Sequence, residues 1–277
     1  MPAPSERYQT RPFLPIRRAY LHVYAAGRRK DLIHGLVEFD VTDARKKLGE
    51  LEAAGHPLSF AAFVLYAVAR AVDADRIVHA YRRRNRLVLF DDVDVNFQVE
   101  SELDGQKVVK SVIIRAANRK TVEELSAEIR IAQRKEPTGE RRYRSMRAFL
   151  FVPRPIRSLA WRVIMANPWW VKRLGGTVGM SSIGMFGPNG GWGIPIAPAT
   201  LMITIGGIAR KPRIIDGSLQ ERELLAVTIS VDHAIVDGAP AARFAARLAE
   251  LVESADSLAD GQRSDPLSLT EAARTSR

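Results

Sequence analysis

The chain has 277 residues, of which 46% are hydrophobic and 26% charged, a composition typical of a globular protein with one domain and extensions. It contains no cysteine, which excludes a disulfide framework, a thiolate nucleophile and cysteine-ligated zinc, and fits a reducing compartment. The formal net charge of +11 predicts an anionic partner, which is nucleic acid, a lipid surface or a phosphorylated cofactor.

The N-terminus predicts an arm, not a secretion signal. Residues 1–15 are polar and contain proline, without the apolar stretch and small-residue cleavage site of a signal peptide. No run approaches 18 apolar residues, so we expect no transmembrane helix and a cytoplasmic protein. The basic clusters carry no nucleic-acid-binding motif, so we expect no nucleic acid partner.

Helices and strands are both expected in the N-terminal half. Alternation of polar and apolar residues predicts a strand over 35–41, and helical spacing of apolar residues predicts helices over 44–53 and 60–72, the second capped by Ser59. Strands are expected at 86–90, 93–99 and 108–114, with a turn at Asp104-Gly105. A further helix begins at Thr121, with two glutamates in its first turn.

Residues 134–172 form an atypical basic and aromatic segment. Arginines come first, and an apolar stretch with Trp161, Trp169 and Trp170 follows. Such a stretch can lie on an anionic membrane surface, which would make the protein peripheral to a membrane, or line a channel for an acyl chain. The alternative is a subunit-packing arm or a flap over the core.

The C-terminal part predicts two apolar strands, over 201–208 and 224–231, with a turn at Asp216-Gly217. A last helix is expected from about Pro240 to Val252, and a flexible tail over 255–277. Strands and helices do not alternate regularly, which favours an α/β protein of the α+β two-layer sandwich type with a mixed sheet. The catalytic domain is expected to cover 16–254.

One motif carries most of the chemistry. The predicted strand ending at Val231 runs into Asp232-His233, and Asp237 and Gly238 follow four and five residues after the histidine. Histidine is a natural general base because its ordinary pKa lies near neutral pH, and a nearby carboxylate can orient it. From spacing alone, a structural histidine at the end of a buried strand is the more common interpretation. The other histidines lack the spacing of metal ligands, so we expect no metal.

The string DHAIVDGAPAARF resembles the His-x-x-x-Asp-Gly signature of the acyltransferase component of 2-oxoacid dehydrogenase complexes and of chloramphenicol acetyltransferase. GTVGMSSIGMFG resembles a second segment of the same family, and PIRRAYLHVYAAG resembles its opening helix. The resemblance covers roughly residues 12–132 and 174–254. It implies a chloramphenicol acetyltransferase-like fold with helices on one face of the sheet, and trimers or higher assemblies of trimers with the active site between subunits.

The resemblance also implies roles for single residues. His233 would take the proton from a thiol of CoA or of a dihydrolipoyl group, and Ser181 would donate a hydrogen bond to the oxyanion, with Ser182 as the neighbouring alternative. Asp237 would pair with an arginine near the N-terminus, Arg17 or Arg18, and Gly238 would support the tight backbone there. The expected enzyme is therefore an acyltransferase that moves an acyl group between a CoA thioester and an unknown acceptor thiol or hydroxyl.

The sequence departs from the family in several places. No lipoyl attachment motif is present, so we expect the lipoyl group not to be carried on this chain, and a stand-alone acyltransferase to be the first interpretation. The second is the trimeric core of a dehydrogenase complex that uses a lipoyl domain on another chain. The third is a non-catalytic scaffold of the same fold. The family resemblance alone leaves the three open.

Overall fold

The structure, a computed structural model, describes residues 9–10, 13, 15–103, 106–134, 152–183 and 190–260. Its centre is a six-stranded sheet in the order β1-β8-β7-β6-β4-β5. The strands are β1 Leu32–Asp40, β4 Val95–Leu103, β5 Gln106–Ile114, β6 Val178–Ser182, β7 Leu201–Ile215 and β8 Ser218–Asp232. Strand β6 runs parallel to both of its neighbours and the other pairs are antiparallel, so the expected mixed sheet is confirmed.

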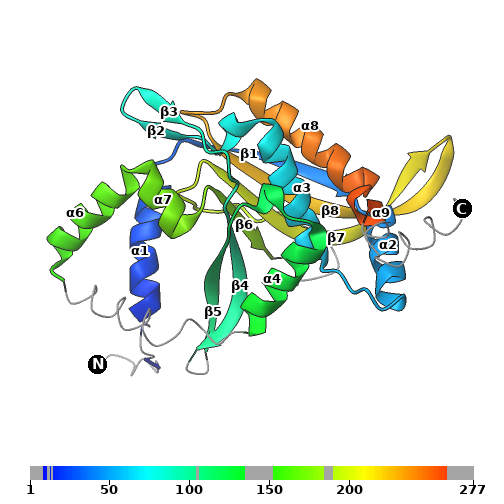
Figure 1. Cartoon of the computed structure of the whole chain (residues 1–277), viewed down its shortest axis with the longest axis horizontal. Helices are drawn as coiled ribbons and strands as arrows, with labels where there is room; N and C mark the ends of the chain where they lie inside the picture. The colour runs from blue at the N-terminus through cyan, green and yellow to red at the C-terminus, as the bar shows by residue number, and fades with distance from the viewer. Residues whose placement is uncertain are drawn as a thin grey trace, which may run out of the picture.

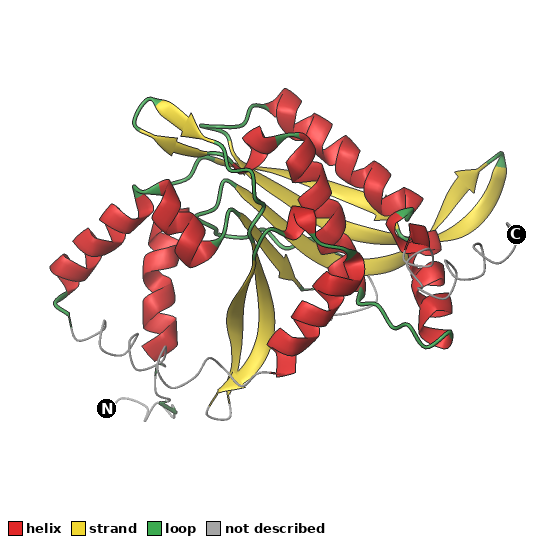
Figure 2. Cartoon of the chain, in the orientation of Figure 1, coloured by secondary structure: helices red, strands yellow, loops and turns green. Residues whose placement is uncertain are grey.

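Helices lie in front of one face of the sheet (Figure 1). They are α2 Thr42–Ala53, α3 Phe60–Ala74, α4 Val122–Arg134, α8 Gly238–Ser254 and α9 Ser257–Asp260. The apolar run of α3 explains its place at the centre: its Phe63, Leu65 and Val68 are fully buried in the main core. Figure 2 shows the resulting two layers, helices over strands. This is the α+β two-layer sandwich expected from the sequence.

Alternation along the strands gives the sheet one apolar and one polar face. Val178 and Met180 of β6, Ile203 of β7 and Ile229 of β8 belong to the core beneath the helices. Because side chains alternate along a strand, the residues between them point to the opposite face. There Ser181 pairs with Thr204, and Thr204 pairs with Thr228. A row of hydroxyls therefore crosses three strands on the face without helices.

The long β7–β8 hairpin turns at the expected place. Asp216 and Gly217 have φ angles of 48° and 77°. A two-residue turn with two left-handed residues matches the twist of the strands that it joins, and Asp-Gly is a preferred pair for it. The strands extend to Ile215 and from Ser218, well beyond the apolar runs from which we predicted them.

The expected strand over 86–90 is shorter and lies outside the main sheet. Strand β3, Arg86–Val88, pairs only with β2, Tyr81–Arg83, in a separate two-stranded hairpin. A short 3-10 helix, η1 Arg76–His79, precedes this hairpin, and a second, η2 Ala117–Arg119, follows β5. Ser59 precedes α3 as expected, but its side chain makes no capping hydrogen bond. The turn at 104–105 lies outside the described residues.

The atypical segment is helical where the structure describes it. Residues 135–151 lie outside the described part, and α6 Arg154–Met165 and α7 Pro168–Gly175 follow. The side chain of Asn167 caps α7 by accepting from the backbone N–H of Trp169 at 3.1 Å. Helix α6 contacts α1, Pro15–Gly27, and Figure 1 shows α1, α6 and α7 together at one end of the molecule.

The C-terminal boundary of the core lies later than expected. Ala255 and Leu258 are buried in the main core, and Leu258 belongs to α9. The predicted tail over 255–277 therefore begins too early, because these two small apolar contacts close the end of the core beside α2. Residues 261–277 lie outside the described part, as does most of the expected arm over 1–15.

Candidate active site

His233 directly follows the C-terminal end of strand β8. Its last residue, Asp232, lies opposite Leu32 of β1, and the backbone N–H of His233 donates to the carbonyl of Asp31 at 2.8 Å. A tight turn follows, in which the N–H groups of Ile235 and Val236 both donate to the carbonyl of Asp232 at 2.9 Å. Backbone hydrogen bonds therefore fix the chain at the histidine and in the turn that follows it.

The imidazole of His233 is oriented by the same turn. Its Nδ1 lies 3.2 Å from the carbonyl oxygen of Val236. A carbonyl only accepts hydrogen bonds, so this contact requires the proton on Nδ1 and leaves the lone pair of Nε2 to accept a proton. The side chain is 49% exposed, so a substrate can reach it. This is the arrangement that a general base requires.

A buried ion pair lies next to this turn. Lys30 Nζ is 2.6 Å from Asp232 Oδ2, and the Asp232 side chain is only 4% exposed. The other oxygen of Asp232 accepts from the backbone N–H of Ala234 at 3.3 Å. The ammonium of Lys30 also lies 5.6 Å from the ring centre of Tyr81. Burial raises the pKa of Tyr81 far above its usual value, so this ring stays neutral.

The predicted pairing of Asp237 with Arg17 or Arg18 is not among the ion pairs of the described chain, and it remains a prediction. Asp237 is 87% exposed at the start of α8, and its Oδ1 lies 3.8 Å from His233 Nδ1. Arg17 and Arg18 lie exposed in the first turn of α1, about 15 Å along the helix from its end at Gly27. The basic partner from the N-terminal region is Lys30, and the carboxylate that it meets is Asp232.

Gly238 is not held in a glycine-specific conformation. It is absent from the residues with positive φ, and an added Cβ would meet no atom within 4 Å. It is the first residue of α8, with ordinary helical geometry. The expected tight backbone at this position is therefore not found within one described chain.

Ser181 lies in the row of hydroxyls on the polar face. Met180 beside it points into the core, so Ser181 faces the other way, toward Thr204 and Thr228. The hydroxyls of these two threonines are buried and have no hydrogen-bond partner in the described chain. Ser182 is exposed and follows on the opposite side of the strand. Ser181 therefore lies beside donors that still need acceptors.

One chain does not bring Ser181 and His233 together. Ser181 lies level with Thr228 across β7, and Asp232 is four residues further along β8, which is about 13 Å at the rise of an antiparallel strand. Two strand spacings of about 5 Å separate β6 from β8 in addition. Hydrogen bonds span about 3 Å, so the two groups of one chain cannot act on the same atom.

Sequence reasoning missed three parts of this region. The Lys30–Asp232 pair joins residues about 200 positions apart, and only the register of β1 with β8 reveals it. The Thr204–Thr228 pair depends on a register in the same way. His34 Nδ1 lies 2.8 Å from the Ser230 hydroxyl on the polar face. Alternation along β8 was the available signal for the threonine and serine side chains.

The described residues form neither a metal site nor a membrane span. They contain no group of three or more histidine, aspartate or glutamate side chains placed to hold a metal ion. Within the same ranges, every helix is too short or too polar to cross a membrane.

Part of the chain is similar in sequence to one family of acyltransferase domains. Residues 172–259, which contain Ser181 and His233, match the family described as 2-oxoacid dehydrogenases acyltransferase (catalytic domain). The lipoamide acyltransferase component of the Bacillus subtilis branched-chain alpha-keto acid dehydrogenase complex is 23% identical to this chain. The match covers 73% of this chain and 41% of the relative. A pyruvate dehydrogenase acetyltransferase component from Zymomonas mobilis is 35% identical over 28% of the chain.

Solved structures show that the fold is shared beyond the matched segment. The cubic core of a pyruvate dehydrogenase complex has a TM-score of 0.69, with 19% identity, over 92% of this chain and 95% of that one. A probable dihydrolipoamide acetyltransferase from Listeria monocytogenes has a TM-score of 0.67, with 19% identity, over 90% and 95%. The expected fold of the acyltransferase family is confirmed. The chain spans about two fifths of the length of the first curated relatives, 41% and 42%.

Proposed function

We propose that this protein is a CoA-dependent acyltransferase in which His233 is the general base. The observation that carries the proposal is the contact between His233 Nδ1 and the Val236 carbonyl, because it fixes the tautomer with Nε2 available. Nε2 takes the proton of an acceptor thiol or hydroxyl, and the acceptor attacks the thioester carbonyl of acyl-CoA. The carbon–sulfur bond to CoA then breaks, and the CoA thiolate takes the proton back from the imidazolium.

Ser181 is the proposed donor to the tetrahedral oxyanion. A solved dihydrolipoamide acetyltransferase from Azotobacter vinelandii, 20% identical with a TM-score of 0.68, is described as a study of a serine, a histidine and an asparagine in the catalytic mechanism. In that description the serine precedes the histidine by 52 residues and the asparagine follows it by four. Ser181 and Asp237 stand at the same spacings from His233 here. This supports Ser181 over Ser182.

A second copy of the chain is proposed to complete the site. Within one chain Ser181 and His233 lie at different levels of the sheet, so the serine must come from a neighbouring subunit. A closed ring of chains gives every histidine a serine from the next chain, and a trimer is our proposal. The cubic core among the similar structures is an assembly of the same kind of domain. Whether further trimers associate decides between a stand-alone enzyme and a core that uses a lipoyl group from another chain.

The acceptor and the compartment are also proposals. Several relatives are named for lipoamide or dihydrolipoyllysine residues, so a dihydrolipoyl thiol is our first candidate acceptor. A cytoplasmic location is proposed from the same relatives. These comparisons do not support contact with an anionic membrane surface.

The test is release of thiol from a panel of acyl-CoAs, with dihydrolipoamide and other acceptors added in turn. The protein has no cysteine, so it does not consume the thiol reagent. Removing the base in His233→Ala should lower the acceptor-dependent rate by about 10²- to 10⁴-fold. Ser181→Ala should lower it by about 10²- to 10³-fold. Ser182→Ala and His56→Ala, which change exposed residues, are the matched controls.

Equal rates in His233→Ala and the native protein would reject the proposed base and leave the scaffold interpretation. Loss of activity in Ser182→Ala with a normal rate in Ser181→Ala would move the oxyanion donor by one residue. Scattering measurements of the assembly separate the remaining two interpretations: isolated trimers favour the stand-alone enzyme, and larger assemblies of trimers favour a complex core.

A further inference from the structure

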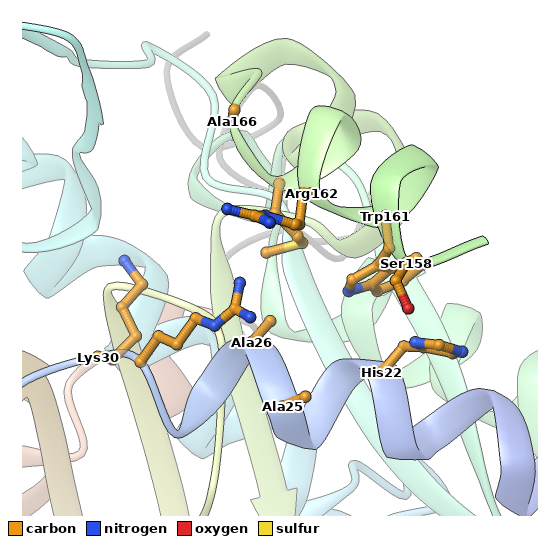
Figure 3. A pocket seen from close by; sticks show the side chains of 10 residues that line it. His22, Ala25, Ala26, Lys30, Ser158, Trp161, Arg162 and Ala166 are labelled. Carbon is orange, nitrogen blue, oxygen red and sulfur yellow. The ribbon is translucent and has the colours of Figure 1, made fainter. Parts of the chain in front are cut away.

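The atypical segment creates a cavity that the proposed mechanism does not use. It lies between α1 and α6 and has a volume of about 330 Å³. Helix α1 contributes His22, Ala25 and Ala26, the following turn contributes Arg29 and Lys30, and α6 with its end contributes Ser158, Trp161, Arg162, Met165 and Ala166. Figure 3 shows Trp161 and Arg162 on one side, across from His22, Ala25 and Ala26. This volume is at the lower end of the range for small-molecule sites, about 300–1,000 Å³, so it suits a compact ligand.

The charged side chains of this cavity, which we call the α1–α6 pocket, are all basic. Arg29, Lys30 and Arg162 line it, and none of the lining residues is acidic. Lys30 is neutralised by Asp232. Arg29 and Arg162 form no ion pair with the described residues. Two guanidinium groups that share one pocket without a carboxylate are suited to binding a carboxylate or phosphate group.

The apolar side of the pocket contains an unmet hydrogen-bond donor. The indole Nε1 of Trp161 is buried, and it has no acceptor in the described chain. Its ring lies 6.3 Å from that of His22, and Ala26 and Met165 complete the apolar wall. A buried N–H without an acceptor costs free energy, and an oxygen of an entering ligand would satisfy it. The pocket therefore combines cations, one free donor and an apolar wall.

The pocket also has a physical connection to the proposed base. Lys30 lines the pocket and binds Asp232, which directly precedes His233. We infer that the α1–α6 pocket binds a compact organic anion, a carboxylate or phosphate on an apolar body, and that the acyl acceptor is such an anion that also carries the reacting thiol or hydroxyl. Binding of the anion does not depend on the proposed function. The role of the anion as acyl acceptor rests on the proposed function.

Direct binding tests the first part. Titration calorimetry of the full chain with hexanoate, hexyl phosphate and neutral hexanamide should show binding of the anions and at least tenfold weaker binding of the amide. Arg29→Gln and Arg162→Gln should each weaken hexanoate binding about tenfold, since each removes a charge-assisted hydrogen bond. Trp161→Phe replaces the indole by a smaller aromatic ring and removes the donor, and should weaken binding about fivefold. Raised salt should weaken the binding of both anions.

The controls separate this inference from the proposed function. Arg28→Gln removes an exposed neighbour that does not line the pocket, and should leave hexanoate binding unchanged. His233→Ala should bind hexanoate normally even though transfer is lost. Equal affinity for hexanoate and hexanamide, or equal weakening by Arg28→Gln and Arg162→Gln, would overturn the anion site. A preference for hexyl phosphate over hexanoate, or the reverse, identifies the head group.

Kinetics test the role of the anion as acceptor. Dihydrolipoate and dihydrolipoamide carry the same thiols, and only the first has a carboxylate. In the native protein dihydrolipoate should have the lower KM, and Arg162→Gln should raise that KM about tenfold with kcat and the KM of dihydrolipoamide unchanged. Equal KM values for both acceptors, in a protein that binds hexanoate, would overturn the acceptor role and leave the anion site. No transfer with either acceptor, with hexanoate binding intact, would count against the proposed function.

Discussion

The ion pair between Lys30 and Asp232 fixes the turn that carries His233. Asp232 is 4% exposed, and Lys30 is its ion-pair partner in the described chain. Lys30→Met would leave a buried carboxylate uncompensated, so we expect the free energy of unfolding to fall by about 3 kcal/mol. Denaturant unfolding measures this, with Arg28→Met as the control because Arg28 is exposed and has no ion pair in the described ranges. Similar losses in both variants would contradict the role of the pair.

His79 makes stability depend on pH. It is fully buried between Thr177 and Phe90, and burial lowers its pKa from 6.5 to about 4. Below pH 6.5 the unfolded chain binds a proton that the folded chain does not bind until about pH 4. The free energy of unfolding should therefore fall as the pH decreases from 6.5 to 4, by up to about 3 kcal/mol.

The measurement for His79 is denaturant unfolding at several values between pH 7.5 and pH 4.5, for the native protein and His79→Asn. Other groups also titrate in this range, so the difference between the two proteins isolates the histidine. The native protein should lose more stability than the variant as the pH falls. Parallel curves for the two proteins would show that folding does not lower the pKa of His79.

At the scale of elements, Gly206 allows a loop to cross strand β7. A Cβ on Gly206 would lie 2.0 Å from the Gly191 carbonyl oxygen and 2.9 Å from that of Ala226. Gly206→Ala should therefore displace the loop at 190–193 or the β7–β8 pair, and lower the free energy of unfolding by about 2 kcal/mol or more. Gly49→Ala in α2 is the control, because nothing lies within 4 Å there, and it should stabilise by about 0.5–1 kcal/mol. A neutral Gly206→Ala would contradict the close approach.

The elements that sequence reasoning found best are those with a local cause. Helix α3 follows from its apolar spacing, and the β7–β8 turn follows from Asp216-Gly217. The two-layer class follows from the irregular mixture of strands and helices. The sequence did not predict where the strand expected at 86–90 pairs. Three of its residues form a small hairpin with β2 and do not join the main sheet. Ala255 and Leu258 were missed since two isolated apolar residues carry no periodic signal.

The site was predictable only where a continuous motif carries it. His233 and its turn are contained in one short string, and the hydrogen bonds that orient the ring are local. The partner of Asp232 was not predictable, because Lys30 reaches it through strand pairing between distant segments. Arg17 was chosen from a resemblance alone, and a helix of this length holds it far from the turn. The α1–α6 pocket depends on two segments that no motif connects.

At the scale of the whole molecule, the proposed assembly predicts complementation. Two inactive variants, Ser181→Ala and His233→Ala, are unfolded together in equal amounts and refolded to exchange subunits. Each site takes its histidine from one chain and its serine from the next, so about a quarter of the sites in random trimers should be intact. Recovery of about a quarter of native activity in the thiol-release assay is expected. No recovery in mixed assemblies, shown by tagged chains, would contradict a shared site.

The level difference between Ser181 and His233 along the sheet has one more consequence. A chain that folds correctly but remains alone holds a base and an oxyanion donor that cannot meet. Activity then depends on the concentration of the chain. Below the dissociation constant of the assembly the chains are folded but inactive, and above it they assemble and become active. For such an enzyme, doubling the amount of chain near that threshold more than doubles the rate.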